Sequence, residues 1–528
     1  ESWASQGRRR WRSASISSSL PAAAVNWWSH KVFSKTTFLS HHYFMSYVAY
    51  LVVVMTLTAI VVYLCEGNVR FSDAAYLSVS AGTMAGLSSF DFTQTKLSTQ
   101  IAIWLHTILC SPMLLTLVPP ALRRRSFFFQ MRFERRRDSP VGRALSSGDL
   151  EVVEYAALGK LSRYVVGYWV GCQLVGWLLL WAFQANRSGP HTGLWSACWP
   201  SLFLATSAFH NCGLSVYAVA FDGTSTAVRV GEMTVIALLI LLGNSCFPIA
   251  LRMLLQAARW RRRGGLGGDP ALDLLLEDPR RCYTHLFPGY ATLWLSLVTV
   301  GLFLMQVVAL IVAESEHFKE TYSPELRYES IVFHSISART AGIPICDLSQ
   351  LSPAAVFALS LAMWISISPV VVATRSTMKP QLRQPDYDMS GGHLEQAPDF
   401  TQMKRQLEAF MNENCILLAF LFFGILHSEQ DTFAPTHFHW IVFEFCSSWG
   451  TVGLSMGPKA YSFSGDWSLR AQVYLMLVMF LGRLRGLPQS IDPSVSLYHV
   501  GTTPPTPRPR ARTTSEMRTF ASATAAAS

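Results

Sequence analysis

Four short segments rich in serine, threonine and glycine have the composition of loops that present backbone carbonyl oxygens to an ion. Each ends in a glycine followed by leucine or isoleucine, and the four glycines are Gly86, Gly213, Gly342 and Gly453. Glycine permits backbone angles that turn successive carbonyls toward one side, and it adds no side chain to block a path. Four such loops around one axis predict a filter in which carbonyl oxygens replace the hydration shell of a monovalent cation.

The residues before these glycines would supply the carbonyls, so a bound K⁺ or Na⁺ is expected to contact backbone oxygens only. These residues are Ala85, Cys212, Ala341 and Val452. The alternative is that the glycines are packing contacts between helices, because Gly82 and Gly86 have the spacing of a small-xxx-small motif. The same ending at four equivalent places favours the filter.

The composition requires a membrane around these segments. The chain has 528 residues, of which 50% are hydrophobic and only 14% charged, and its mean hydropathy is +0.27. A soluble chain carries about 25% charged residues, whereas the uncharged runs here approach the ~20 residues that cross a bilayer. We predict a polytopic membrane protein, and the composition excludes a secreted disulfide scaffold, a nucleic-acid-binding domain and a coiled coil.

A fourfold repeat positions the glycines. Each unit contains a long apolar span, a short Ser/Gly/Thr segment and a second span, which is the kind of internal repeat that defines an architecture. The prediction is an all-α protein with eight spans and four pore loops around one pseudo-fourfold pore. The expected elements are 43–65, 74–90 and 97–119; 164–185, 195–213 and 232–252; 288–313, 328–342 and 353–375; and 411–427, 438–453 and 468–483.

Arginine clusters flank spans on one side, so the positive-inside rule places both termini and the basic loops in the cytoplasm. Asn186 begins a glycosylation sequon on the opposite side. No cleavable signal peptide is expected at the beginning of the chain. The predicted organisation is an N-terminal segment 1–40, repeat A 41–122, a basic loop 123–160, repeat B 161–255, a loop 256–285, repeat C 286–376, a loop 377–408, repeat D 409–490 and a disordered tail 491–528.

A helix break is expected in the second span of repeat C. Pro369 removes a backbone donor, and Ser366 and Ser368 can satisfy the freed carbonyls. This segment could serve as a gate or as a structural kink, and the sequence does not distinguish the two roles. Asn244 and Pro248 in repeat B are expected to be polar packing that shapes the inner vestibule.

Several motifs make the chain resemble the Trk/Ktr/HKT superfamily of potassium and sodium transporters, over about residues 40–495. Within the superfamily the chain resembles the eukaryotic members, fungal Trk and plant HKT, and the last motif is more similar to the fungal type than to the plant type. The motifs are Ser337-Ala-Arg-Thr-Ala-Gly342, Asp347-Leu-Ser-x-Leu-Ser-Pro353, Leu242-Gly-Asn-Ser-Cys-Phe-Pro-Ile-Ala-Leu-Arg252, Gly450-Thr-Val-Gly453, Tyr461-Ser-Phe-Ser-Gly465 and Gly482-Arg-Leu-Arg-Gly-Leu-Pro488.

The resemblance implies uptake of K⁺, with Na⁺ as a second permeant ion, across the plasma membrane. Its filter residues fall on the four glycines, and glycine at Gly86 goes with K⁺ permeability. An arginine below the filter acts as a barrier or gate in the family and corresponds to Arg483. The alternative is that Arg483, with Arg485 two residues later, is an ordinary positively charged flank of a membrane span. Relatives form homodimers, so a homodimer in the lipid bilayer is expected, with no cofactor and no nucleic acid.

Other functional classes have less support. His427, His437 and His439 lack the spacing of a metalloenzyme helix motif, and the chain has no phosphate-binding loop, so an enzyme is not expected. Two transport alternatives stay open, namely a Na⁺-selective HKT-like transporter and a symporter that couples K⁺ to H⁺ or Na⁺.

Overall fold

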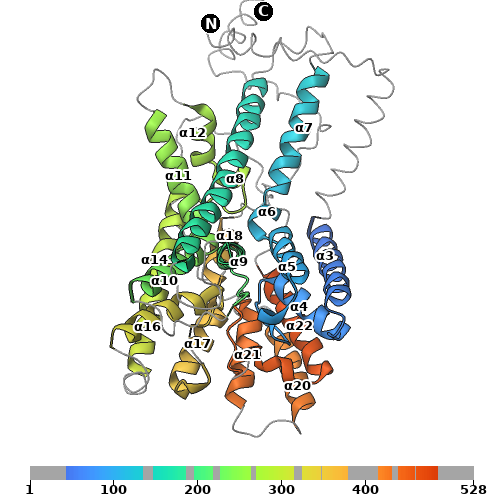
Figure 1. The fold of residues 1–528 in the computed structure, drawn as a ribbon. Coiled ribbons are helices and arrows are strands. Elements are labelled where there is room, and N and C mark those ends of the chain that lie inside the picture. The colour runs from blue at the N-terminus through green and yellow to red at the C-terminus, as the bar shows by residue number, and fades with distance from the viewer. Residues whose placement is uncertain are drawn as a thin grey trace, which may run out of the picture.

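The computed structural model describes ten stretches of the chain, and all structural statements below concern them. Within these stretches the regular structure is helical and no strand occurs (Figure 1). Asn186, segment 1–40 and tail 491–528 lie outside the described residues. The described residues are 43–134, 147–185, 195–217, 226–262, 269–313, 324–345, 348–377, 414–430, 438–457 and 460–485.

The helices follow the predicted order of span, short helix and span in each repeat. The first spans are α3 (Tyr43–Glu66), α8 (Ser147–Ala185), α14 (Gly289–Ala313) and α20 (Cys415–Glu429). The short pore helices are α4 (Phe71–Thr83), α9 (Cys198–His210), α16 (Pro324–Thr340) and α21 (Phe438–Gly450). The second spans begin with α5 (Leu97–Leu109), α10 (Thr226–Gly243), α17 (Pro353–Ile365) and α22 (Leu469–Leu484).

Further helices extend or connect these elements. Helices α6 (Pro112–Leu115) and α7 (Val118–Glu134) continue the second span of repeat A, α11 (Phe247–Arg262) continues that of repeat B, and α18 (Ser368–Ser376) continues that of repeat C. The connection between repeats B and C contains α12 (Pro270–Glu277) and α13 (Pro279–Cys282). Single 3-10 turns are η1 (Phe92–Gln94), η3 (Leu348–Gln350) and η5 (Phe463–Asp466).

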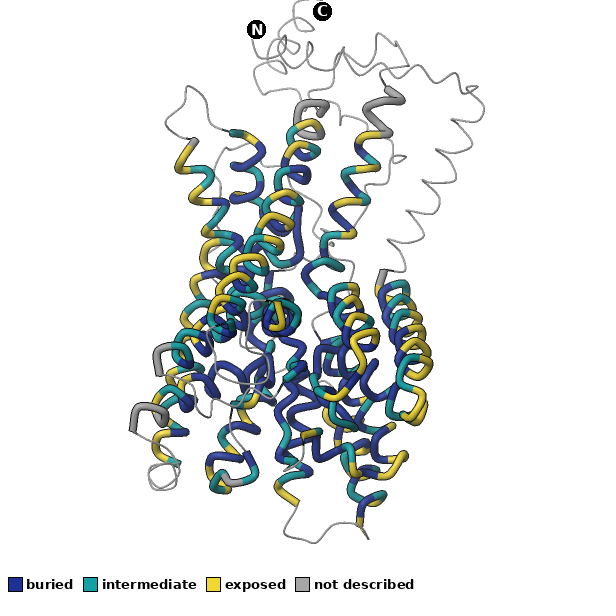
Figure 2. The backbone as a smooth tube through the Cα atoms, in the orientation of Figure 1, coloured by how far each residue is buried: buried dark blue, intermediate teal, exposed yellow. Residues whose placement is uncertain are grey.

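The four repeats pack in a closed ring. In each repeat the second span contacts the pore helix of the next repeat: α5 packs on α9, α10 on α16, α17 on α21, and α22 on α4. The last contact joins the end of the sequence to its beginning. This repeated contact brings the four pore helices to the centre of the molecule, where Figure 2 shows most of the buried chain.

The outer helices have the surface expected of lipid-facing spans. Helix α3 is apolar around its whole circumference, and Met45 and Leu64 are 62% and 72% exposed. Helix α14 likewise exposes Leu293, Leu297 and Val312. Because water would penalise so much exposed apolar surface, this exterior is consistent with contact to acyl chains.

Six of the eight predicted crossings have the required length and hydropathy in the described residues. Four segments qualify as single spans, and they lie within α3, α8, α14 and the continuous stretch of α17 and α18. Two bent pairs, α5 with α6–α7 and α10 with α11, qualify only when each pair is taken as one span. Helix α20 has 15 residues and α22 has 16, which is shorter than the ~20 residues of a straight crossing. Eight crossings therefore stay a prediction.

One expectation about continuity was wrong, and one segment expected as a loop is partly helical. The second span of repeat A was expected as one clean helix over 97–119, but its two parts meet at 43° around Cys110 and Ser111, and the corresponding angle in repeat B is 82°. The basic loop expected over 123–160 is helical at both ends, because α7 continues to Glu134 and α8 begins at Ser147. Arginine, leucine, alanine and glutamate are good helix formers, so a helix need not end where the apolar run ends.

The helical extensions are joined by a buried charge cluster. The Glu154 carboxylate of α8 forms ion pairs with Arg123 of α7 and with Arg281 of α13, the latter at 2.7 Å. Arg123 also donates to the Arg281 carbonyl at 2.8 Å. Glu154 is 1% exposed, and one carboxylate shared by two guanidiniums thus ties three elements together.

Candidate ion pathway

Each pore helix ends in a hydrogen-bonded turn that carries the chain toward the centre. The amide of Ala85 donates to Ser80 O, that of Cys212 to Ser207 O and that of Val452 to Ser447 O, at 2.8 to 3.0 Å. In repeat C the equivalent bond starts one residue later, from Gly342 to Ser337 O at 3.0 Å. These bonds satisfy helix-terminal carbonyls in the manner of a Schellman cap.

All four filter glycines adopt a left-handed backbone. Their φ angles are +68° at Gly86, +80° at Gly213, +63° at Gly342 and +105° at Gly453. Other residues rarely adopt these angles because Cβ collides with the backbone. The conformation therefore selects glycine at these four positions before any neighbour is considered.

The glycines and the preceding carbonyls form one ring. A Cβ on Gly213 would lie 2.6 Å from Ala341 O, and one on Gly453 would lie 2.5 Å from Ala85 O. A Cβ on Gly86 would likewise collide with Cys212 O, and one on Gly342 with Val452 O. Each glycine thus lies against the carbonyl before the glycine of the next repeat, and the last repeat contacts the first.

This arrangement gathers all eight residues predicted for the filter. Four short helices direct their C-terminal ends, which carry partial negative charge, toward this centre. Backbone oxygens on a closed ring of four loops can solvate a cation that has lost its water. Among the described residues, no group of three His, Cys, Asp or Glu side chains offers an alternative metal site.

The two arginines at the end of α22 have different surroundings. Arg483 is half-buried, and its guanidinium donates to the carbonyl of Cys110, at the break in the second span of repeat A. Arg485 is buried, donates to Gly482 O at 3.0 Å and lies 4.5 Å above the Trp449 ring of pore helix α21. Arg483 therefore reaches across to repeat A, whereas Arg485 is part of the packing beneath repeat D.

The predicted break in repeat C lies between α17 and α18. Helix α17 ends at Ile365 and α18 begins at Ser368, with Pro369 in its first turn. Ser366 has a φ of 34° and is fully buried, and its Oγ donates to Gly450 O at the end of α21 at 2.8 Å. The break therefore contacts the neighbouring pore helix.

Repeats A and D are joined by hydrogen bonds that the sequence did not predict. The Ser88 amide donates to Ser462 Oγ at 2.9 Å, and the Ser462 amide donates to Ser88 O at 2.9 Å. Ser464 Oγ donates to the buried Glu444 carboxylate at 2.7 Å and lies 2.7 Å from the Tyr76 hydroxyl. The available signal was Glu444 itself, because an acidic residue within a membrane segment is rare and usually has a role.

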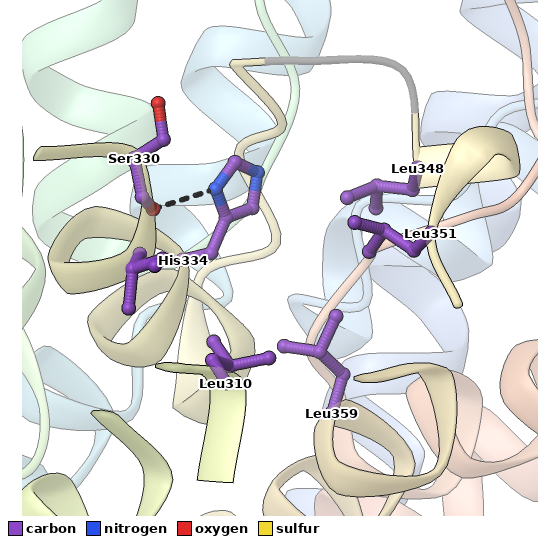
Figure 3. A pocket seen from close by; sticks show the side chains of 7 residues that line it. Leu310, Ser330, His334, Leu348, Leu351 and Leu359 are labelled. Carbon is purple, nitrogen blue, oxygen red and sulfur yellow. Dashed lines mark hydrogen bonds between the residues drawn. The ribbon is translucent and has the colours of Figure 1, made fainter. Parts of the chain in front are cut away.

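A small cavity beside the pore helix of repeat C is a packing feature. His334 Nδ1 donates to Ser330 O one turn earlier at 2.9 Å, as Figure 3 shows. Leucines from α14, α17 and η3 form most of the remaining wall, which offers little to a polar ligand. The lining residues are Leu310, Ser330, Ile331, His334, Leu348, Leu351 and Leu359.

The fold and the central ring define a class, namely all-α membrane proteins built from pore-loop repeats. The TrkH family model, described as a cation transport protein, matches residues 13–498. The chain belongs to this family, which groups it with transport proteins and not with enzymes. The potassium transporter TrkH from Vibrio parahaemolyticus has a similar fold, with a TM-score of 0.51, 12% identity and coverage of 83% of this chain and 81% of that one.

Two of the curated relatives are fungal proteins named for potassium transport. "Potassium transporter TRK1" of Candida albicans is 26% identical over 458 residues, which cover 82% of this chain and 40% of that protein. The "High-affinity potassium transport protein" of Saccharomyces cerevisiae is 27% identical over 421 residues, covering 67% and 34%. The chain thus spans about two fifths or less of the length of these two relatives.

Proposed function

We propose that this protein moves K⁺ inward across the plasma membrane through the ring of Gly86, Gly213, Gly342 and Gly453. The observation that supports this most strongly is the closed ring of glycines and preceding carbonyls, in which every repeat contributes equally. The names of the fungal relatives support K⁺ as the ion. A negative cell interior attracts a cation by ~2.3 kcal/mol per 100 mV.

The orientation that we propose follows from the basic residues. The arginine-rich parts of α7 and α11 extend from the same end of the molecule in Figure 1. Cytoplasmic loops carry the excess of basic residues, so this end would face the cytoplasm, as would the two termini. In this orientation the outer mouth lies at the opposite end, toward which α16, α17 and α20 point.

The decisive experiment is growth rescue of cells that lack K⁺ uptake. Cells with this protein should grow on low K⁺, and cells with a Gly342→Ala variant at equal surface abundance should not, because the added Cβ collides with Val452 O. Failure of rescue by a protein that reaches the surface would contradict the proposal.

Electrical recording distinguishes a K⁺ uniporter from the alternatives. If the protein carries K⁺ alone, the reversal potential follows the K⁺ gradient and ignores pH and Na⁺. A reversal potential that follows Na⁺ would indicate the Na⁺-selective type, and a shift with both K⁺ and a second gradient would indicate symport.

A further inference from the structure

The break between α17 and α18 contains a residue in an unfavourable conformation. Ser366 has φ 34° and ψ −117°, and its side chain and backbone are fully buried. A non-glycine residue keeps such a conformation only where its surroundings determine it. The contacts of Ser366 therefore show what holds the break in place.

Two pore helices hold this residue from different sides. From α16, the Arg339 guanidinium donates to Ser366 O at 3.2 Å. Toward α21, Ser366 Oγ donates to Gly450 O at 2.8 Å. The break is thus bonded to the helices that lead to Gly342 and Gly453, two adjacent members of the ring.

Arg339 is placed to link several elements at once. It lies in the last turn of α16, is 6% exposed, and uses its second terminal nitrogen to bind Thr299 O of α14 at 3.3 Å. No ion pair to Arg339 occurs among the described residues, so its partners are the two carbonyls. A planar guanidinium can hold two acceptors in a fixed geometry, which the single ammonium group of lysine cannot do.

Repeat A shows the same chemistry at its own break. The carbonyl of Cys110, the residue that follows α5, accepts a hydrogen bond from Arg483. Repeats A and C are not adjacent in the ring, so two opposite second spans each present a freed carbonyl to an arginine of another element. A broken helix inside a membrane needs such donors.

We propose that Arg339 is a positioning residue that latches the α17–α18 break to the filter. Movement of the break at Ser366 would have to release the bonds that fix the ends of α16 and α21. Opening of the break and the geometry of the filter are therefore coupled. This inference rests on the proposed transport function, but its structural part can be tested without ion flux.

The test measures how readily the break opens. Ile367, half-buried within the break, is changed to Cys, and its rate of modification by a membrane-impermeant, charged thiol reagent is compared with the labelling of the unchanged chain. In this background Arg339→Gln should raise the rate about tenfold or more, the shift expected when a hydrogen bond to a charged group is lost. Ser366→Ala, which removes the bond to Gly450, should also raise it.

Two further variants make the test specific. Arg252→Gln removes a comparable bond, from Arg252 Nη1 to Phe287 O at 2.6 Å, that involves neither Arg339 nor Ser366, and should leave the rate unchanged. Arg339→Lys keeps the charge but not the two-carbonyl fork and should raise the rate. If the modification rate with Arg339→Lys equals the rate with Arg339 in place, a positive charge alone is sufficient and the latch is refuted.

Ion flux then tests the coupling. Arg339→Gln and Ser366→Ala should each change the Na⁺-to-K⁺ permeability ratio together with the modification rate, at equal surface abundance. If Arg339→Gln does not reach the surface, Arg339→Lys and Ser366→Ala carry the test, and unaltered rates in both would overturn the proposal. Absence of flux in the unchanged protein would contradict the transport function, while the labelling rates would still decide the latch.

Discussion

At the residue scale, two separate constraints require glycine at each filter position. The positive φ excludes most other residues, and the carbonyl of the next repeat occupies the space that a Cβ would take. The first constraint is local and the second depends on the neighbouring repeat. A substitution should therefore disturb both its own loop and the adjacent carbonyl.

Gly86→Ser should lower K⁺ flux and shift preference toward Na⁺. The serine Cβ would displace Cys212 O, and such overpacking costs about 1–3 kcal/mol, each ~1.4 kcal/mol of which corresponds to about tenfold in relative permeation. Reversal potentials in mixed K⁺ and Na⁺ solutions measure the change. Gly67→Ser is the matched control, because Gly67 also has positive φ but nothing within 4 Å of its Cβ position. Unaltered selectivity of Gly86→Ser would show that this loop is not part of the filter.

Arg483→Ala should raise K⁺ conductance severalfold. A fixed positive charge near the path repels the permeating ion by about 1–4 kcal/mol at a separation of ~4 Å, depending on the local dielectric. Single-channel or noise analysis gives the conductance per molecule. Arg485→Ala serves for comparison: it removes the packing on Trp449 and should lower surface abundance without raising conductance per molecule. Equal conductance of Arg483→Ala and the unchanged protein would exclude the barrier role.

At the element scale, three second spans are broken helices within the described residues. Each continuation has proline in its first turn, at Pro112, Pro248 and Pro369. Proline is favoured there because the first-turn amides lack helical partners in any case. The sequence indicated the break in repeat C, but the breaks in repeats A and B depend on how the halves pack. Asn244 lies at the 82° bend of repeat B, where its carbonyl accepts a hydrogen bond from the Phe247 amide at 3.1 Å.

Glu154→Gln should destabilise the extensions formed by α7, α8 and α13. The change removes the carboxylate charge that Arg123 and Arg281 share, and removal of one partner from a buried ion pair costs about 3–5 kcal/mol. The melting temperature of detergent-solubilised protein measures the loss. Asp73→Asn, which removes the partner of the 85% exposed Arg70, should have little effect. Equal melting temperatures of Glu154→Gln and the unchanged protein would contradict the stabilising role of the buried cluster.

At the scale of the whole molecule, the pore exists only when the ring closes. The first and last repeats are joined by Ser88 with Ser462 and by Tyr76 with Ser464. Residues nearly 400 positions apart in the chain thus share one interface. No repeat has a complete ion site on its own, because each glycine is placed against the carbonyl of its neighbour.

Ser462→Ala should weaken this closure. The Ser88 amide loses the Ser462 Oγ acceptor, at a cost of about 1–3 kcal/mol for a buried donor. We expect a lower melting temperature and reduced discrimination between K⁺ and Na⁺, measured on the same preparation. Ser428→Ala is a suitable control, because the hydrogen bond that Ser428 Oγ makes among the described residues is to Gly424 O, within its own helix α20. A normal melting temperature with normal selectivity would argue against a role for this junction.

The repeat and the filter positions could be read from the sequence because both depend on local chemistry. A long uncharged run of apolar residues indicates a membrane span, and a Ser/Gly/Thr segment that ends in glycine indicates a turn with a positive φ angle. The partners of Arg339, Glu444 and Ser462 could not be read in this way. Their hydrogen bonds join residues of different helices or repeats, and no periodicity in the chain specifies which carbonyl or carboxylate a distant side chain will meet.

The sequence by itself determined the membrane environment, the four repeated units and the glycines that end the pore helices. Only the tertiary structure decided that each glycine faces the carbonyl of the next repeat, that Arg483 and Arg339 bind the carbonyls of broken helices, and that Ser88 and Ser462 close the ring. The physical reason is that hydropathy and backbone preference act along the chain, whereas hydrogen bonds and close packing depend on which surfaces meet after folding.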